Sequence, residues 1–167
     1  MITMLRRRPA LSVFAIIAAV IVLGVAWWLG SPLFLNQAVN EAPIASSAQT
    51  MNEKAGSFRN GDDFHRGSGQ AVIYTQPDGT RQLQLENFQV TNGPDLFVVL
   101  TAAADPSTSS EVHAAGYVEL ARLKGNLGNQ VYDLPADLDL GSVNSVVIYC
   151  RAFSVVFSVA PLETATS

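Results

Sequence analysis

The sequence contains one cysteine and two histidines among its 167 residues. A single cysteine, Cys150, cannot form an internal disulfide, so the fold must be stable without one. The chain also lacks a G-x-S-x-G turn, a glycine-rich phosphate loop and an H-E-x-x-H helix. These absences give no support to an ordinary hydrolase or transferase.

Basic residues are scarce beyond the first eight positions. The remaining chain carries seven Lys and Arg against fourteen Asp and Glu, a formal charge of −7, and the basic residues form no stripe. Nucleic acids and anionic membrane surfaces attract positively charged proteins. We therefore expect no nucleic-acid partner.

One long hydrophobic run is present, at residues 10–29, and it contains no charged residue. A helix of this length spans roughly 30 Å, the thickness of a bilayer core. Three arginines at 6–8 precede the run, and Trp27 and Trp28 lie at its end. Arginines stay on the cytoplasmic side and tryptophans favour the interface. The pattern predicts a single-pass membrane anchor with a cytoplasmic N-terminus and an extracytoplasmic C-terminal domain.

A cleaved signal peptide is the competing interpretation of this run. The apolar core of a signal peptide usually has about 7–15 residues and is followed by small residues. This run is longer and ends in two tryptophans, so we favour an uncleaved anchor, although the sequence leaves cleavage open. No cysteine lies near the run, which excludes a lipoprotein signal.

Composition divides the chain into five parts. Residues 1–9 are the basic cytoplasmic end and residues 10–29 are the anchor. Residues 30–57 are rich in Ala, Ser, Asn and Gln without a sustained apolar period, which predicts a flexible extracytoplasmic linker. Residues 58–162 form the compact domain, and residues 163–167 are a disordered tail.

The compact domain has the pattern of short strands separated by turns. The turn Pro77-Asp78-Gly79 joins strands at 69–76 and 80–88 into a hairpin. Further strands are expected at 95–100, 130–134 and 143–159, the last broken near Arg151-Ala152; 103–110 is a polar loop and 116–123 fits a strand or a helix. About seven or eight short strands predict an all-β fold, an antiparallel β-sandwich. Its expected core includes Phe88, Leu96, Val98, Leu100, Ile148 and Phe157.

Cys150 shares one face of its strand with Val146 and Ile148. These apolar neighbours predict a buried face, on which a cysteine acts as a small hydrophobic residue. In an unbroken strand Arg151 points to the other face, and only a turn would bring its charge close to the thiol. On the residues alone, a packed core cysteine and a reactive or ligating thiol both stay open.

His65 and His113 are the only imidazoles in the chain. Together with Cys150 and Met51 they match the composition of a blue-copper site. The spacing does not support such a site, because no histidine or methionine follows Cys150. Both histidines lie in polar, loop-like contexts, so we expect surface histidines and no metal site.

Carboxylates gather at Asp62-Asp63 and again at Asp133, Asp137 and Asp139. Their spacing lacks the glycine and the terminal glutamate of a helix-loop-helix calcium loop, so a solvated acidic edge is expected. Asp95 differs, because it follows Gly93-Pro94 and opens an apolar strand. A half-buried carboxylate in that position usually accepts hydrogen bonds from turn amides.

The order of several motifs resembles the DM13 domain family across residues 58–162. The motifs are G-S-G-Q-A at 67–71, L-Q-L-E-N-F at 83–88, G-P-D-L at 93–96, the segment 120–128 followed by Y-D-L-P at 132–135, and Y-C-R-A-F at 149–153. Tyr149 stands where tryptophan is expected in many relatives, so an aromatic residue is retained.

The resemblance implies a role in extracellular electron transfer. The cysteine matching Cys150 is the signature residue of the family and is expected to act as a thiol or as a ligand to a group such as non-covalent haem. The aspartate matching Asp95 belongs to the same motif. Covalent c-type haem is excluded, because the chain has no C-x-x-C-H.

Two functions follow as hypotheses. The first is a membrane-anchored redox or electron-transfer accessory protein with a DOMON-type or cytochrome-like partner. Whether it is an enzyme stays open, and it is at most a redox or electron-transfer component. The second is a binding module of the cell envelope in which Cys150 is only a packed core residue.

Overall fold

The computed structural model describes residues 9–30, 35–44 and 51–165 of the chain. The chain divides into two compact units, Met1–Leu35 and Asn36–Ser167, each with its own internal contacts. We describe each unit by itself.

The first unit contains helix α1 (Pro9–Gly30), with large apolar side chains exposed from Val13 to Trp27. Its sequence carries no charged residue, which accounts for the apolar surface on all sides. Among the residues described, no helix meets the length and hydropathy required of a membrane span. The span predicted at 10–29 is not shown by the structure and stays a prediction from the sequence.

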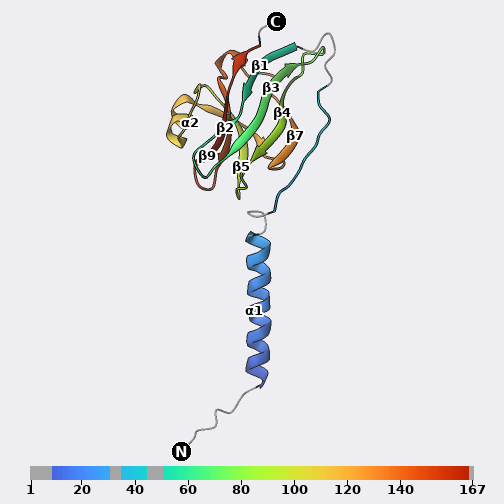
Figure 1. The fold of residues 1–167 in the computed structure, drawn as a ribbon, viewed down its shortest axis with the longest axis vertical. Coiled ribbons are helices and arrows are strands. Elements are labelled where there is room, and N and C mark those ends of the chain that lie inside the picture. Colours follow the sequence, from blue (N-terminus) through green and yellow to red (C-terminus); the bar gives the residue numbers. More distant parts are fainter. Residues whose placement is uncertain (1–8, 31–34, 45–50, 166–167) are drawn as a thin grey trace, which may run out of the picture. The chain divides into compact units, whose positions relative to one another are not determined.

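The second unit, the β-domain, consists of two antiparallel sheets of five strands each (Figure 1). Sheet A has the order β10–β1–β3–β4–β7, and sheet B has the order β2–β9–β8–β5–β6. The strands of sheet A are β1 (Met51–Ser57), β3 (Gly67–Thr75), β4 (Arg81–Val90), β7 (Leu127–Asp133) and β10 (Glu163–Thr164). Those of sheet B are β2 (Arg59–Asn60), β5 (Leu96–Thr101), β6 (Tyr117–Arg122), β8 (Ser145–Cys150) and β9 (Val155–Pro161).

The arrangement confirms the predicted all-β, sandwich-like fold. The hairpin predicted around Pro77-Asp78-Gly79 joins β3 to β4. Its turn closes because the Gly79 amide donates to Gln76 O and the Thr80 amide donates to the Asp78 carboxylate. Gly79 has φ +84°, a conformation that glycine adopts without strain.

The core lies between the facing sheets, and every residue predicted for it is buried there. The principal cluster includes Phe88, Leu96, Val98, Leu100, Ile148 and Phe157, together with Cys150. A smaller cluster covers the outer face of sheet B with Phe97, Val99, Val112, Val147, Tyr149, Val156 and Val159. Alternate residues of β5 and β8 therefore enter different clusters, as the period of two in a strand requires.

A short helix, α2 (Ser109–Ala115), covers part of the outer cluster through Val112. It begins within the segment expected to be a polar loop at 103–110. Thr108 and Glu111 form a reciprocal capping box that satisfies the first amides of the helix. The ambiguous segment at 116–123 forms a strand, β6, because it pairs with β5 along the edge of sheet B.

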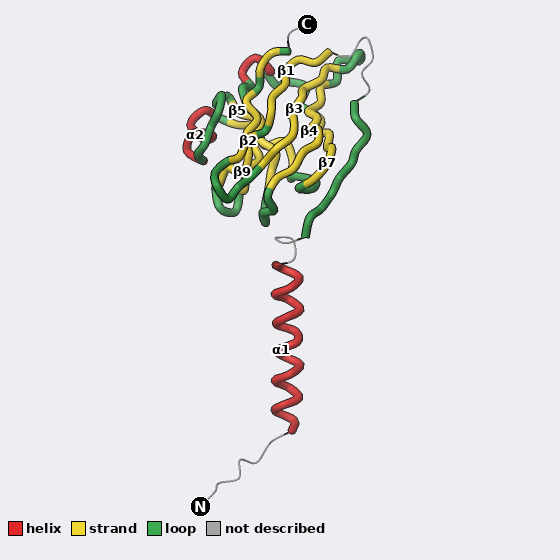
Figure 2. The backbone as a smooth tube through the Cα atoms, viewed as in Figure 1, coloured by secondary structure: helices red, strands yellow, loops and turns green. Residues whose placement is uncertain are grey.

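The predicted linker at 30–57 is wrong over the residues that the structure describes there from 36 onward. Residues 51–57 form β1, which pairs with β3 and β10. Residues 36–44, here called the strap, run along β7, with a parallel bridge between Ala38 and Leu127 (Figure 2). Residues 45–50 lie outside the described part. The predicted tail at 163–167 is likewise corrected at its start, which forms β10.

Close backbone contact explains why the strap fits at this edge. A Cβ added to Gly128, which has φ +97°, would meet the carbonyl oxygen of Val39. The strap is then fixed by its polar groups, since the Val39 amide donates to Leu127 O at 2.9 Å and the Glu41 amide to Asn129 O at 3.0 Å. The sequence shows that the strap contains polar residues, but it does not show which backbone groups the strap pairs with.

We predict that the strap responds to acid through Glu41. Its carboxylate lies 2.8 Å from Lys124 Nζ and accepts the Val131 amide at 2.6 Å. The hydrogen bond from Lys124 lowers the pKa of Glu41, an effect only partly opposed by burial. The stabilisation is therefore complete above the ordinary glutamate pKa of about 4.3 and is lost as the pH falls through the lowered value.

Nuclear magnetic resonance titration checks this directly. The Val131 amide should shift with a midpoint below that of an ordinary glutamate, and Lys124→Gln should raise the midpoint. If the Val131 amide shifts with the same midpoint in a Glu41→Gln variant, a group other than Glu41 is responsible.

Candidate functional site

Cys150 is the last residue of β8 and lies in the core between the sheets. It pairs with Leu96 on β5 and with Val155 on β9, and its exposure is 0%. Val146 and Ile148 occupy the same buried face, as their spacing predicts. The turn 151–154 follows immediately, and all four of its residues are exposed. The thiol is therefore buried but only one residue from a solvent-facing turn.

The break predicted near Arg151-Ala152 is this turn, and it brings Arg151 to Asp95. The Arg151 amide donates to Asp95 O at 3.0 Å, and Arg151 Nε lies 3.2 Å from the Asp95 carboxylate. The guanidinium stacks over the ring of Phe97, 4.1 Å from its centroid. Phe97 belongs to the outer cluster of sheet B, so the arginine charge lies on the face opposite the thiol.

Asp95 is held by arginines and not by the turn amides that its sequence context suggests. In addition to Arg151, Arg122 Nη2 lies 3.6 Å from Asp95 Oδ1 and donates to Pro94 O at 2.9 Å. Glu119 Oε1 lies 3.5 Å from Arg151 Nη1. We call the paired Asp95 and Arg151 the clasp, because they join the start of β5 to the end of β8.

A β-bulge lies beside the clasp. The pairing of β8 with β9 shifts between Ile148 and Tyr149, which leaves Phe157 as the extra residue of β9. The ring of Phe157 lies in the core, and the His65 ring packs on it with centroids 4.1 Å apart. A side chain at Gly93 would come within 2.7 Å of Leu96 and 2.9 Å of Phe157. Bulges are common next to functional sites, where they redirect side chains.

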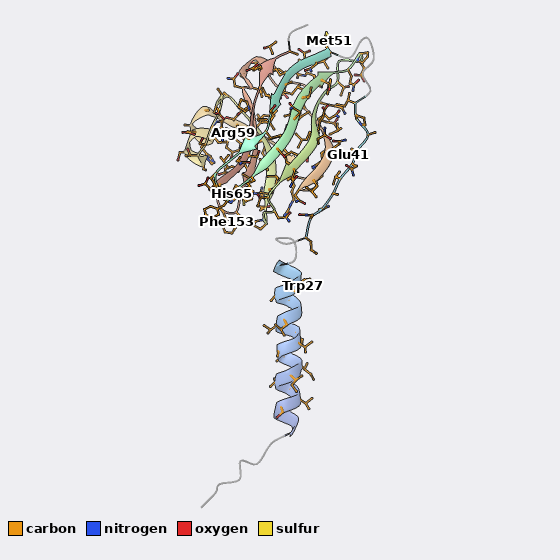
Figure 3. The ribbon with its side chains drawn as sticks, in the orientation of Figure 1. Trp27, Glu41, Met51, Arg59, His65 and Phe153 are labelled. Carbon is orange, nitrogen blue, oxygen red and sulfur yellow. The ribbon has the colours of Figure 1, made fainter. Side chains whose placement is uncertain are left out.

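The two histidines occupy different places. His65 Nδ1 lies 2.7 Å from the Asp62 carboxylate, and this hydrogen bond lowers the pKa of Asp62. His113 lies on α2, where its Nδ1 approaches the carbonyl of Ser109 and its ring faces Tyr149 edge-on. The loop-like context predicted for His113 is thus a short helix. Met51 lies on β1, at the opposite end of the β-domain from His65 (Figure 3).

Three of the five predicted acidic positions, Asp62, Asp133 and Asp139, serve local structure. Asp62 accepts the amides of Phe64 and His65, and Asp139 accepts the Gly141 amide. Asp133 accepts a hydrogen bond from Gln82 across β4 and β7. In the part of the chain that the structure describes, no three His, Cys, Asp or Glu side chains gather in a way that could hold a metal ion.

Haem does not fit Cys150 in this conformation. An axial ligand needs an open position at the sulfur for the iron, whereas Cys150 is fully buried between paired strands. Haem ligation at this residue would require the packed core around the sulfur to open.

Three residues of the site escape prediction from the sequence: Arg122, Glu119 and Phe97. Arg122 and Glu119 are isolated charges on an edge strand, and Phe97 is one member of an apolar run. Their meeting with Arg151 depends on the registers of β5 with β6 and β8. The sequence holds one signal that could have indicated the clasp. Arg151 carries a positive charge in the turn after Cys150, and Asp95 carries a negative charge at the start of a strand.

Comparison with known families gives one match. A family model described as "Electron transfer DM13" matches residues 57–162, nearly the extent of the domain predicted at 58–162. Neither the curated proteins nor the solved structures contain a match to the chain. The matched segment includes Cys150, Asp95 and the strands that carry them.

We predict that Cys150 contributes to stability through packing. Cys150→Ala should lower the free energy of unfolding by about 1 kcal/mol or somewhat more, because the sulfur leaves a small cavity. Cys150→Ser should be worse, since a buried hydroxyl without a partner costs about 1–3 kcal/mol. Denaturant unfolding measures both. A serine variant as stable as the wild type would contradict the packing shown here.

Proposed function

The chain belongs to the DM13 family, and from this premise we propose that it is a membrane-anchored, extracytoplasmic accessory protein of a redox or electron-transfer system. In this proposal Cys150 acts as a protected thiol, which becomes accessible when the clasp opens. The family match supports the redox-related role. The observation that carries the thiol proposal is the position of a fully buried cysteine directly before an exposed turn.

The energetics of the clasp support local opening. The Arg151 side chain is 56% exposed, and ion pairs at such positions typically stabilise a protein by at most about 1 kcal/mol. Unfolding of a whole domain costs about 5–15 kcal/mol, and local openings span the range below that. The turn 151–154 can therefore open far more often than the β-domain unfolds.

The membrane anchor in this proposal rests on the sequence of α1 and its flanks. The helix contains 22 residues, none of them charged, and three arginines precede it. This asymmetry favours a cytoplasmic N-terminus and an extracytoplasmic β-domain. The partner is then a redox protein of the envelope, of the DOMON or cytochrome-like kind that the family resemblance implies.

The zero exposure of Cys150 favours a second candidate function. In that case the β-domain is a binding module and the cysteine only fills the core, as many free cysteines do. The two candidates differ in one measurable property: a protected thiol reacts through local opening, and a packed thiol reacts only after global unfolding.

We predict that weakening the clasp accelerates modification of Cys150 by a thiol reagent. Asp95→Asn removes the charge that pairs with Arg151, and the labelling rate under native conditions should rise by about three- to tenfold, the equivalent of roughly 1 kcal/mol. The matched control is Asp105→Asn, which removes a similar exposed ion pair with Arg59 elsewhere on the β-domain. Its rate should stay within about twofold of the wild type.

Global stability of the same variants, measured by denaturant unfolding, separates the two candidates. If the labelling rate follows the global unfolding free energy in every variant, the protected-thiol function is excluded and the binding module remains.

The topology is tested with introduced cysteines in a Cys150→Ala background. Asp63 is exposed on the β-domain, so an Asp63→Cys variant should react with a membrane-impermeant maleimide on intact spheroplasts. Thr3→Cys, before the arginines, should react only after permeabilisation. Labelling of Thr3→Cys alone on intact spheroplasts would contradict the proposed orientation, and release of the protein by alkaline washing would contradict the anchor.

A further inference from the structure

Three turns gather at one end of the β-domain: 61–66, 91–95 and 151–154. The Thr91 hydroxyl accepts the Arg66 amide at 2.9 Å, which joins the first turn to the second. The Arg151 amide donates to Asp95 O, which joins the second to the third. Figure 3 shows His65 and Phe153 at this end and Met51 at the other. We call it the clasp end.

Two large aromatic side chains are exposed at the clasp end. Phe64 is 83% exposed and Phe153 is 68% exposed, and each lies within one of the three turns. Exposed phenylalanine is unfavourable in water by roughly 1.5–3 kcal/mol relative to burial. Two such side chains on neighbouring turns of one end indicate a surface that is covered in the working protein.

The strap enters the β-domain at the same end. Asn36 Oδ1 accepts hydrogen bonds from Asn92 at 3.1 Å and from Asn126 at 2.9 Å. The Gln37 amide donates to Asn126 Oδ1 at 2.7 Å. The first residue of the β-domain is thus fixed beside the turn 91–95 by its own polar contacts.

Only five residues separate Gly30, the last residue of α1, from Asn36. A fully extended chain of this length spans about 20 Å at most. If α1 is a membrane anchor, as proposed above, covalent reach alone keeps Asn36 within that distance of the lipid surface. The clasp end, which holds Asn36 through Asn92 and Asn126, then lies within reach of the lipid surface.

We propose that the clasp end rests on the lipid surface and inserts Phe64 and Phe153 among the headgroups. The inference rests on the anchor in the proposed function. Arg66, Arg122 and Arg151 are matched at this end by Asp62, Asp63, Asp95 and Glu119. With no excess of positive charge, the surface suits zwitterionic lipid and gains its contact from the aromatic rings.

Membrane contact would determine the side from which a redox partner approaches the buried thiol. The turn 151–154, which carries Phe153, is also the turn that directly follows Cys150. Insertion of Phe153 couples the lipid surface to the position of this turn. A redox partner would then reach the thiol from the plane of the membrane.

The test uses the full chain reconstituted into phosphatidylcholine vesicles with brominated or ordinary acyl chains. In a Trp27→Phe, Trp28→Phe background, single tryptophans are introduced by Phe153→Trp, Phe64→Trp and Met51→Trp. Met51 is the matched control, because it is 60% exposed at the opposite end. Bromine should reduce emission roughly twofold or more for the two clasp-end variants and leave the Met51→Trp variant unchanged.

The unmodified chain reports on the anchor separately through Trp27 and Trp28. Quenching of the native tryptophans, without quenching at positions 64 and 153, would overturn lipid docking and keep the anchor. No quenching of the native tryptophans would overturn the anchor itself.

The introduced tryptophans have two further outcomes. Equal quenching of all three would indicate non-specific adsorption. Shielding from acrylamide without bromine quenching would assign the surface to a protein, such as a second copy of the chain. Both results contradict the proposal.

Discussion

The antiparallel register between β5 and β8 is the constraint on which the rest of the site depends. It places Leu96 opposite Cys150 and carries Asp95 to the backbone of Arg151. A slip of one residue would move Cys150 from the buried face to the outer face of sheet B. The apolar residues that alternate between the two clusters oppose such a slip, so the hydrophobic pattern of two central strands fixes the position of the thiol.

At the clasp end, a well-packed core lies next to a turn that is held by weak interactions. The thiol lies among buried core residues, whereas the groups that hold the turn directly after it are exposed charges and a cation–π contact on Phe97. The β-bulge at Phe157 interrupts the ladder beside the same turn. Because local stability follows local contacts, this end of sheet B is expected to open before the centre does. The proposed protected thiol depends on this combination.

Sequence reasoning succeeds where the information is local. The hairpin at Pro77-Asp78-Gly79, the break after Cys150 and the buried faces of β5 and β8 all follow from turn chemistry and the period of two. The resemblance carried by the motifs around Asp95 and Cys150 agrees with the family match. These features were predictable because each depends on neighbours in the chain.

The failures concern partners far apart in sequence. The strap has the composition of a linker because it lacks a sustained apolar period, yet its polar groups pair with β7 and with Asn126, about 90 residues away. The arginines around Asp95 come from a turn and an edge strand, and only strand register brings them together. The strand β1 was missed because its sequence, MNEKAGS, lacks β-branched residues and depends on pairing with β3 for its structure.

The most direct test of the account is amide hydrogen exchange of β8 and its turn as a function of urea. The Arg151 amide, which closes the clasp, should exchange with an opening free energy well below that of Val147 in the middle of the strand. Its opening should also depend only weakly on urea, because a local opening exposes little surface. Exchange of both amides with the same free energy and the same urea dependence would mean that the turn opens only when the β-domain unfolds, which contradicts the protected thiol.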